Sequence, residues 1–216
     1  MKKNVLLFSV GIITFVFIFI HIVNIIPTSI VKDSKQKEFI VYDTSADWTT
    51  VKQKELEPIF LEQDLSNHFV DTETMSCFFI TMKMLGHDVD IDQFYWDFFK
   101  EVDNEEIPHE GKISPSGLYD ISLIYLATQK DLSLSTQYIG DKGFEYLDQV
   151  VKNNYPVIVW SGGDDWPQST PYVAYKSDHD SLCLINSESL VIANKEIFRK
   201  NWEKSGSYAI LYGKYW

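Results

Sequence analysis

The first hydrophobic feature of the chain is an uncharged apolar run, VLLFSVGIITFVFIFIHIVNII, at residues 5–26. At about 1.5 Å per helical residue, this run is long enough to cross a bilayer. A cleaved signal peptide is the alternative, but its apolar region is usually shorter and ends in small residues, whereas this run leads into PTSI. We therefore predict a transmembrane helix at residues 5–26. Because Lys2 and Lys3 precede it, residues 1–4 should lie in the cytoplasm and the rest of the chain outside.

The next strong pattern is helical and covers residues 72–85. Apolar residues recur there at a spacing of 3.6 on more than one side, which is typical of a buried helix. Asp71 or Thr72 is placed to cap its start, and Gly86 is placed to end it. The apolar positions are Met75, Cys77, Phe78, Phe79, Ile80, Met82 and Met84.

The patterns that follow predict one α+β domain at residues 56–216, in which helices pack on an antiparallel sheet. Helices come first along the chain and strands come later. Residues 27–55 are expected to be a linker with a possible first strand, EFIVYD. Helices are predicted at residues 91–102, 115–130, 141–153 and 195–205, and strands at residues 132–139, 155–160, 171–177, 180–186, 190–194 and 207–213.

The charge of the chain narrows the choice of partners. It has 19 basic and 31 acidic residues, and three of the basic ones, Lys2, Lys3 and Lys32, lie in the first 32 residues. The remainder therefore has 16 basic and 31 acidic residues, a formal charge of −15. A domain of this charge should be repelled by nucleic acid and by anionic lipid. We expect no nucleic-acid partner.

The chain has two cysteines, Cys77 and Cys183. A disulfide between them is permitted outside the cell, but both lie in apolar stretches, CFFI and LCLI, which favours two buried free thiols. Neither spacing indicates a metal site. We expect no metal and no cofactor.

Four segments, in this order and at this spacing, resemble the bacteriocin-processing-type cysteine peptidases of family C-39 and their C-39-like relatives, which have a papain-like fold. The segments are IFLEQ at 59–63, TETMSCFFITMKMLGHDVD at 72–90, NNYPVIVW at 153–160 and PYVAYKSDHDSLCLINS at 171–187. The resemblance spans residues 57–212. It implies a papain-like cysteine peptidase fold for the domain.

The resemblance also implies that the catalytic positions have changed. Counted back from Gly86, the nucleophile of the family falls on Glu73, and Cys77 falls where the family has a serine. The position of the catalytic histidine falls on Pro171, and that of the aspartate that orients it falls on Ser187. Only Gln63, at the position of the glutamine that stabilises the oxyanion, matches the family.

These replacements argue against peptide hydrolysis. A thiol peptidase needs a thiolate at a helix N-terminus and an imidazole to transfer the proton. Glu73 is a poor nucleophile toward an amide, and Pro171 has no titrating group. Cys77 is the alternative nucleophile, with a displaced histidine. It lies one turn deeper, a shift of about 5.4 Å, and its apolar neighbours should raise its pKa.

Two tryptophans, Trp160 and Trp166, flank the loop after the strand at 155–160 and are candidates for binding a ligand at the remnant cleft. We therefore predict a bacterial single-pass membrane protein with an extracytoplasmic C-39-like domain, a pseudoenzyme that binds a peptide or protein partner. Two alternatives stay open. One is an active cysteine peptidase that uses Cys77, and the other is an accessory or immunity-type protein of a peptide-export system.

Overall fold

The computed structural model describes residues 30–32, 38–40, 48, 52–99, 111–129 and 133–214, without the side chains of the first two ranges and of Phe98, Phe99 and Trp166. The chain forms two compact units, Met1–Tyr42 and Asp43–Trp216. In the first unit, β1 (Ile30–Lys32) pairs antiparallel with β2 (Glu38–Ile40), which lies within the predicted EFIVYD strand. The predicted cytoplasmic residues 1–4 and transmembrane helix 5–26 lie outside the described residues. Among the helices that are described, none is long and apolar enough to span a membrane.

The second unit combines helices with one sheet. Its helices are α2 (Thr72–Met84), α3 (Ile91–Phe94), α4 (Pro115–Thr128), α5 (Phe144–Lys152) and α6 (Lys195–Lys204), with short η turns at Tyr95–Phe99, Gly140–Lys142 and Trp166–Gln168. Its strands are β3 (Leu134–Tyr138), β4 (Val157–Ser161), β5 (Thr170–Ser177), β6 (Ser181–Ile185), β7 (Leu190–Asn194) and β8 (Ala209–Lys214).

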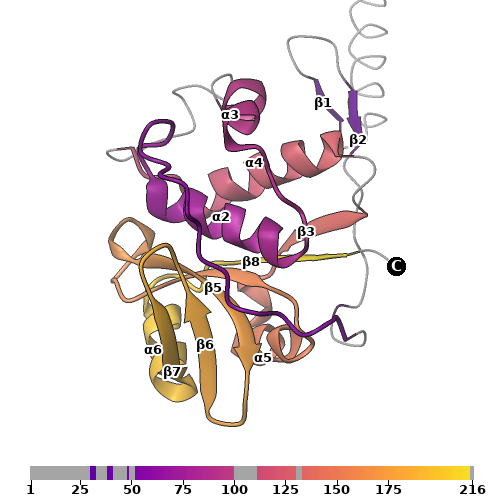
Figure 1. Cartoon of the computed structure of the whole chain (residues 1–216). Coiled ribbons are helices and arrows are strands. Elements are labelled where there is room, and N and C mark those ends of the chain that lie inside the picture. The colour runs from indigo at the N-terminus through magenta and orange to yellow at the C-terminus, as the bar shows by residue number, and fades with distance from the viewer. Residues whose placement is uncertain are drawn as a thin grey trace, which may run out of the picture. The chain divides into compact units, whose positions relative to one another are not determined.

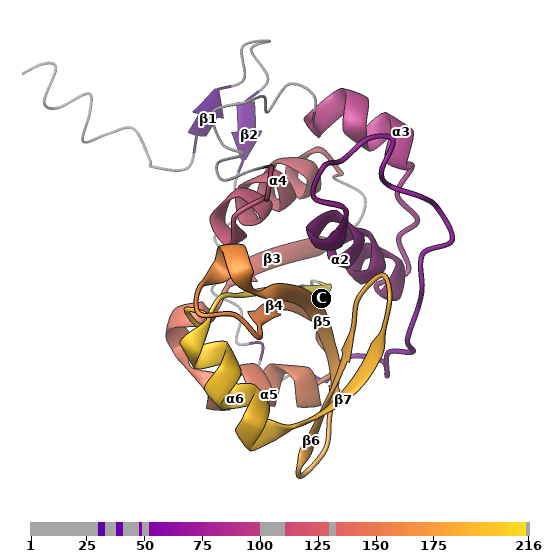
Figure 2. The same cartoon turned by 90° about the vertical axis from the view of Figure 1, so that its left-hand side faces the viewer.

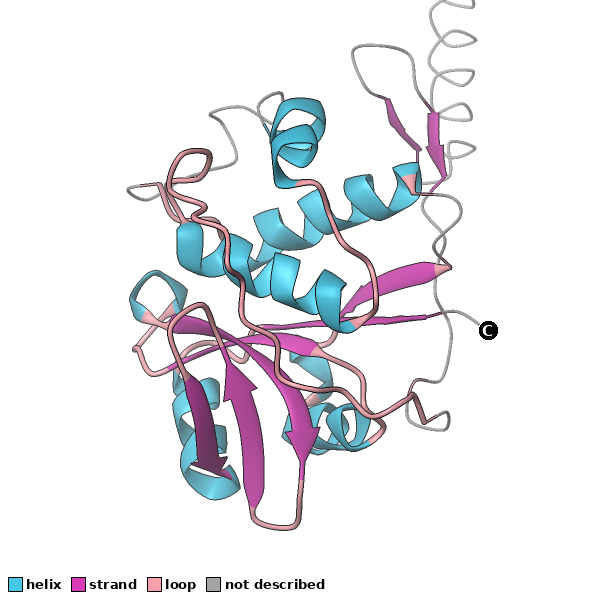
Figure 3. Ribbon diagram, in the orientation of Figure 1, coloured by secondary structure: helices cyan, strands magenta, loops and turns pink. Residues whose placement is uncertain are grey.

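The six strands form one antiparallel sheet in the order β3-β8-β4-β5-β6-β7. Helices α2 and α4 cover one face of this sheet, and α5 and α6 cover the other (Figures 1 and 2). Figure 3 shows the separation of helical layers from the sheet. The prediction of an α+β domain with helices packed on an antiparallel sheet is confirmed.

Two hydrophobic cores lie on the two faces of the sheet, and the alternation of side chains along β4 separates them. Ile158 and Trp160 point into the core under α2 and α4, whereas Val157 and Val159 point into the core over α5 and α6. Because both faces are covered, every residue of β4 is buried. This explains the continuous apolar run in the sequence.

Helix α2 is the most deeply buried helix of the unit, with every residue from Thr74 to Met82 buried. Asp71 caps its N-terminus, as predicted, and Gly86 follows its C-terminus with a φ of +81°. Glycine adopts this left-handed conformation without a Cβ penalty. The helix is therefore fixed at both ends as well as along its length.

Two predicted helices begin or end differently. The helix predicted at 91–102 is regular only to Phe94 and continues as a π-helical turn, which lets the consecutive Phe94 and Tyr95 pack on Phe79 and Phe69. The helix predicted at 141–153 begins instead at Phe144. Gly143, with a φ of +83°, separates it from a short 3-10 turn.

Candidate functional site

The N-terminal turn of α2 faces the start of β5, and there Glu73 and Pro171 line the same small pocket. Trp160 also lines it and pairs with Pro171 across β4 and β5. The volume of this pocket is about 10 Å³, which is about the space that one water molecule needs. The structure thus brings together the predicted nucleophile and histidine positions, in a space too small for a peptide.

The side chain of Asp71 accepts two backbone hydrogen bonds at this end of α2. Its Oδ1 accepts a hydrogen bond from the Thr74 N–H (3.0 Å), and its Oδ2 accepts one from the Ile113 N–H (2.8 Å). The neighbouring Lys112 donates from Nζ to the carbonyl of Pro167 (2.9 Å). A carboxylate of the chain itself therefore lies at the positive end of the helix dipole.

Cys77 lies in the core one turn further along α2 and is completely buried. Burial raises the pKa of the Cys77 thiol well above its usual value, and the negative charges of Asp71 and Glu73 raise it further. The thiolate is the nucleophilic form of cysteine, so this environment opposes reactivity. The prediction of a buried free thiol is confirmed for Cys77.

Cys183 is also free, but it is only partly buried, so the prediction of a second buried thiol was wrong. It lies opposite Ile192 in the register of β6 and β7, and Ile192 is 72% exposed. Strand β7 is the edge strand of the sheet, so Cys183 lies one strand from the edge, where fewer residues cover it. Burial of the remaining thiol surface still raises the pKa of Cys183.

Each histidine that the structure describes has a partner away from Cys77. His68 Nε2 lies 2.8 Å from Asp92 Oδ1, and His179 Nδ1 lies 2.5 Å from Asp180 Oδ1. His87 Nε2 lies 2.6 Å from the hydroxyl oxygen of Tyr125, and burial lowers the pKa of His87. Within the same part of the chain, no cluster of three or more histidine, cysteine or acidic side chains could hold a metal ion.

No protein-family model and no curated protein matches the chain. Its structure is similar to that of a Bacillus anthracis protein described as a C-39-like peptidase, with 15% sequence identity, a TM-score of 0.53, and coverage of 76% of this chain and 99% of the other. The chain has the fold of a C-39-like peptidase. A second similar structure is the peptidase domain of Streptococcus ComA, a bifunctional ABC transporter involved in quorum sensing, with 19% identity, a TM-score of 0.48, and coverage of 73% and 98%.

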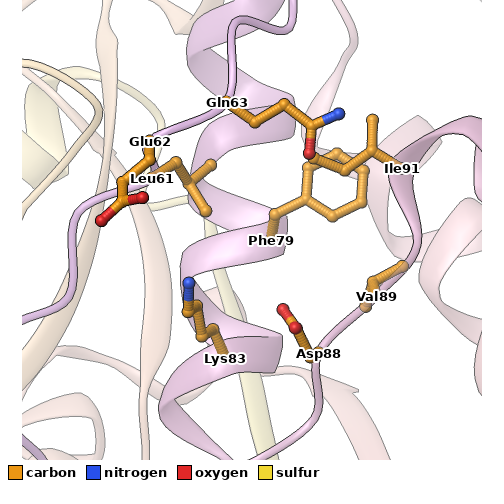
Figure 4. A pocket seen from close by; sticks show the side chains of 8 residues that line it. All are labelled: Leu61, Glu62, Gln63, Phe79, Lys83, Asp88, Val89 and Ile91. Carbon is orange, nitrogen blue, oxygen red and sulfur yellow. The ribbon is translucent and has the colours of Figure 1, made fainter.

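The other two predicted positions in this C-39-like fold lie apart from Glu73 and Pro171. Gln63 is exposed and lines a different pocket, beside Leu61 and Phe79 (Figure 4). Ser187 lies in the turn after β6, where Asn186 Oδ1 accepts hydrogen bonds from the backbone N–H groups of Glu188 and Ser189. Neither residue lines the pocket at the start of α2.

Trp160, one of the two tryptophans proposed as ligand contacts, differs from expectation. Trp160 is 1% exposed and belongs to the core of the C-39-like domain, so it cannot offer a face to a ligand. The side chain of Trp166 lies outside the described residues. The contact between Asp71 and Ile113 could not be predicted from the sequence, because nothing in the pattern of the loop at 111–113 links it to α2.

Proposed function

We propose that this protein is a membrane-anchored, extracytoplasmic C-39-like domain that does not hydrolyse peptides and acts by binding a peptide or protein partner. The observation that carries this proposal is the small pocket at the start of α2. Its volume of about 10 Å³ is bordered by Glu73 and Pro171. These side chains supply neither a thiol nor an imidazole.

The buried state of Cys77 supports the same proposal against the displaced-nucleophile alternative. A cysteine must reach the substrate carbonyl and must ionise to attack it. Cys77 has no exposed surface, and burial and nearby acids hold its pKa above the usual value. The histidines described in the structure are engaged with Asp92, Tyr125 and Asp180.

The membrane anchor rests on the sequence. The uncharged run at 5–26 has the length of a bilayer-spanning helix, and Lys2 and Lys3 place its N-terminal side in the cytoplasm. The C-39-like unit would then lie outside the cell. There its strongly acidic composition keeps it soluble and away from anionic headgroups.

The test uses the full-length chain, purified in a zwitterionic detergent and immobilised. It is exposed to a defined library of peptides of 8–12 residues, and mass spectrometry quantifies which peptides are retained and which are cleaved. We expect retention of a subset of intact peptides and no cleavage. Cleavage that Cys77→Ala abolishes and Cys183→Ala does not would establish an active peptidase instead. Retention no greater than that of a detergent-only support would refute peptide binding and favour the accessory-protein alternative.

A further inference from the structure

A second pocket lies on the side of α2 that faces away from the sheet, and its volume is about 380 Å³. It is bounded by the extended segment that includes Leu61, by α2 and by the turn that leads into α3 (Figure 4). Phe79 from α2, Val89 from the turn and Ile91 at the start of α3 supply apolar walls. The volume of this pocket lies within the range of ligand sites, whereas the pocket beside Glu73 is far too small.

Charged groups border this pocket beside the apolar walls. Lys83 and Asp88 extend toward the pocket from α2 and from the turn, and Glu62 lies on the opposite rim (Figure 4). Within the part of the chain that the structure describes, these three side chains form no ion pair. Nearby acids are already engaged, because Glu55 pairs with Lys176 and Asp92 with His68.

The net charge at the rim favours a basic ligand. Two carboxylates and one ammonium group border the pocket, and residues 33–216 carry a formal charge of −15 from 16 basic and 31 acidic residues. An acidic ligand would be repelled by this field, whereas a lysine or arginine side chain would be attracted to it.

The backbone beside the pocket is also available. Residues 54–63 belong to no helix or strand, and in the described structure none of their backbone N–H or C=O groups has a hydrogen-bond partner within the protein. Extended segments with unpaired backbone groups are templates for an added strand. Phe60, which is 47% exposed, adds apolar surface to the same segment.

We propose that residues 59–63 and this pocket bind an extended basic peptide. Its backbone pairs with residues 59–63, one apolar side chain enters the pocket between Phe79 and Val89, and flanking lysine or arginine side chains lie near Glu62 and Asp88. This inference rests on the proposed peptide-binding function. It places the ligand outside the pocket at Glu73 and Pro171 and specifies the chemistry of the peptide.

The probe is a fluorescein-labelled octapeptide of four Lys-Leu repeats, and its binding to the full-length chain in detergent is followed by fluorescence polarisation. We expect it to bind at least tenfold more tightly than four Lys-Ser repeats. Val89→Trp should weaken binding at least tenfold because the indole fills the pocket, and Glu62→Lys should weaken it by reversing a rim charge. The matched control is Glu196→Lys on α6, which covers the opposite face of the sheet and should change the Kd less than twofold.

Two N-methylated versions of the peptide test backbone pairing, one methylated at every lysine and one at every leucine. A peptide strand presents alternate N–H groups to its neighbour, so exactly one version should lose at least tenfold in affinity. The inference is overturned if the Lys-Leu peptide does not bind, if Val89→Trp and Glu62→Lys bind it like the unmodified chain, or if both methylated versions bind like the parent. Library retention that persists in Val89→Trp would leave the proposed function intact and refute only this site.

Discussion

The carboxylate of Asp71 joins the start of α2 to a loop 42 residues further along the chain, because its Oδ2 accepts the Ile113 N–H at 2.8 Å while its Oδ1 caps the helix. A helix cap contributes about 1 kcal/mol, and a hydrogen bond to a charged group about 1.5–3 kcal/mol. We expect Asp71→Ala to lower the free energy of unfolding by about 2–3 kcal/mol, as measured by urea titration.

Asp90→Ala is the matched control for this prediction. Asp90 caps α3 in the same way, with Oδ1 accepting the Gln93 N–H at 3.0 Å, but it is exposed and joins no second segment. Its loss should cost about 0.5–1 kcal/mol. Equal effects of the two substitutions would show that the bond to Ile113 adds nothing to stability.

The two thiols should differ in their reaction with iodoacetamide. Only the thiolate reacts, and burial raises the pKa of both thiols, but Cys77 is fully buried whereas Cys183 is partly exposed. We expect Cys183 to be labelled in the folded protein, and to be labelled faster as the pH rises above the usual pKa of a thiol. Cys77 should be labelled only at the rate at which the protein unfolds. Peptide mass mapping distinguishes the sites. Rapid labelling of Cys77 below pH 8 would contradict a closed core around it.

The features that could be predicted from the sequence are those that a local pattern encodes. The apolar spacing of α2, with Asp71 before it and Gly86 after it, specified both its burial and its ends. The apolar run of β4 specified a strand covered on both faces. Capping, periodicity and glycine conformation act over a few residues, so they are legible without a structure.

The site depended on contacts that no local pattern carries. Trp160 was expected to border a cleft, but the pairing of β4 with β5 and the cover of α2 place it in the core. Cys183 was expected to be buried, but its apolar neighbours do not reveal that β7 is an edge strand. The large pocket likewise forms where residues 61–63 cross α2. A contact between distant segments of this kind produces no periodic pattern in the sequence, so it could not be predicted.

An ion pair between α5 and α6 should stabilise the packing of these two helices on their face of the sheet. Lys195 Nζ lies 2.7 Å from Asp148 Oδ1, and both side chains are largely buried, whereas Lys152, 2.8 Å from Oδ2, is 42% exposed. Removing Lys195 takes away the more buried cation and leaves Asp148 with the exposed Lys152 and with Ser177. We expect Lys195→Met to cost about 1–3 kcal/mol and Lys152→Met less than about 0.5 kcal/mol in urea titrations.

The same carboxyl should make stability depend on pH. Burial raises the pKa of Asp148, but hydrogen bonds from Lys152, Lys195 and Ser177 outweigh burial and hold it below the ordinary 3.8. Asp148 therefore contributes stability above pH 3.8, and this contribution is lost as pH falls through the lower pKa of the folded state. Asp148→Asn should flatten this acid limb of the stability curve, measured by thermal unfolding between pH 2 and 6. An unchanged limb would mean that the pair does not persist in solution.

Placing a thiol at position 73 and an imidazole at position 171 should not produce catalysis. In Glu73→Cys/Pro171→His, a thiol and an imidazole would enter a pocket of about 10 Å³, beside a carboxylate that already caps α2. The charge of Asp71 disfavours a thiolate at this position, and Gln63, the predicted oxyanion donor, lines a different pocket. We expect no cleavage of the peptide library by the full-length double variant. The single variant Glu73→Cys serves as the control for labelling of the new thiol. Hydrolysis by the double variant and not by Glu73→Cys would show that the site opens on its own and that two substitutions alone separate this chain from a peptidase.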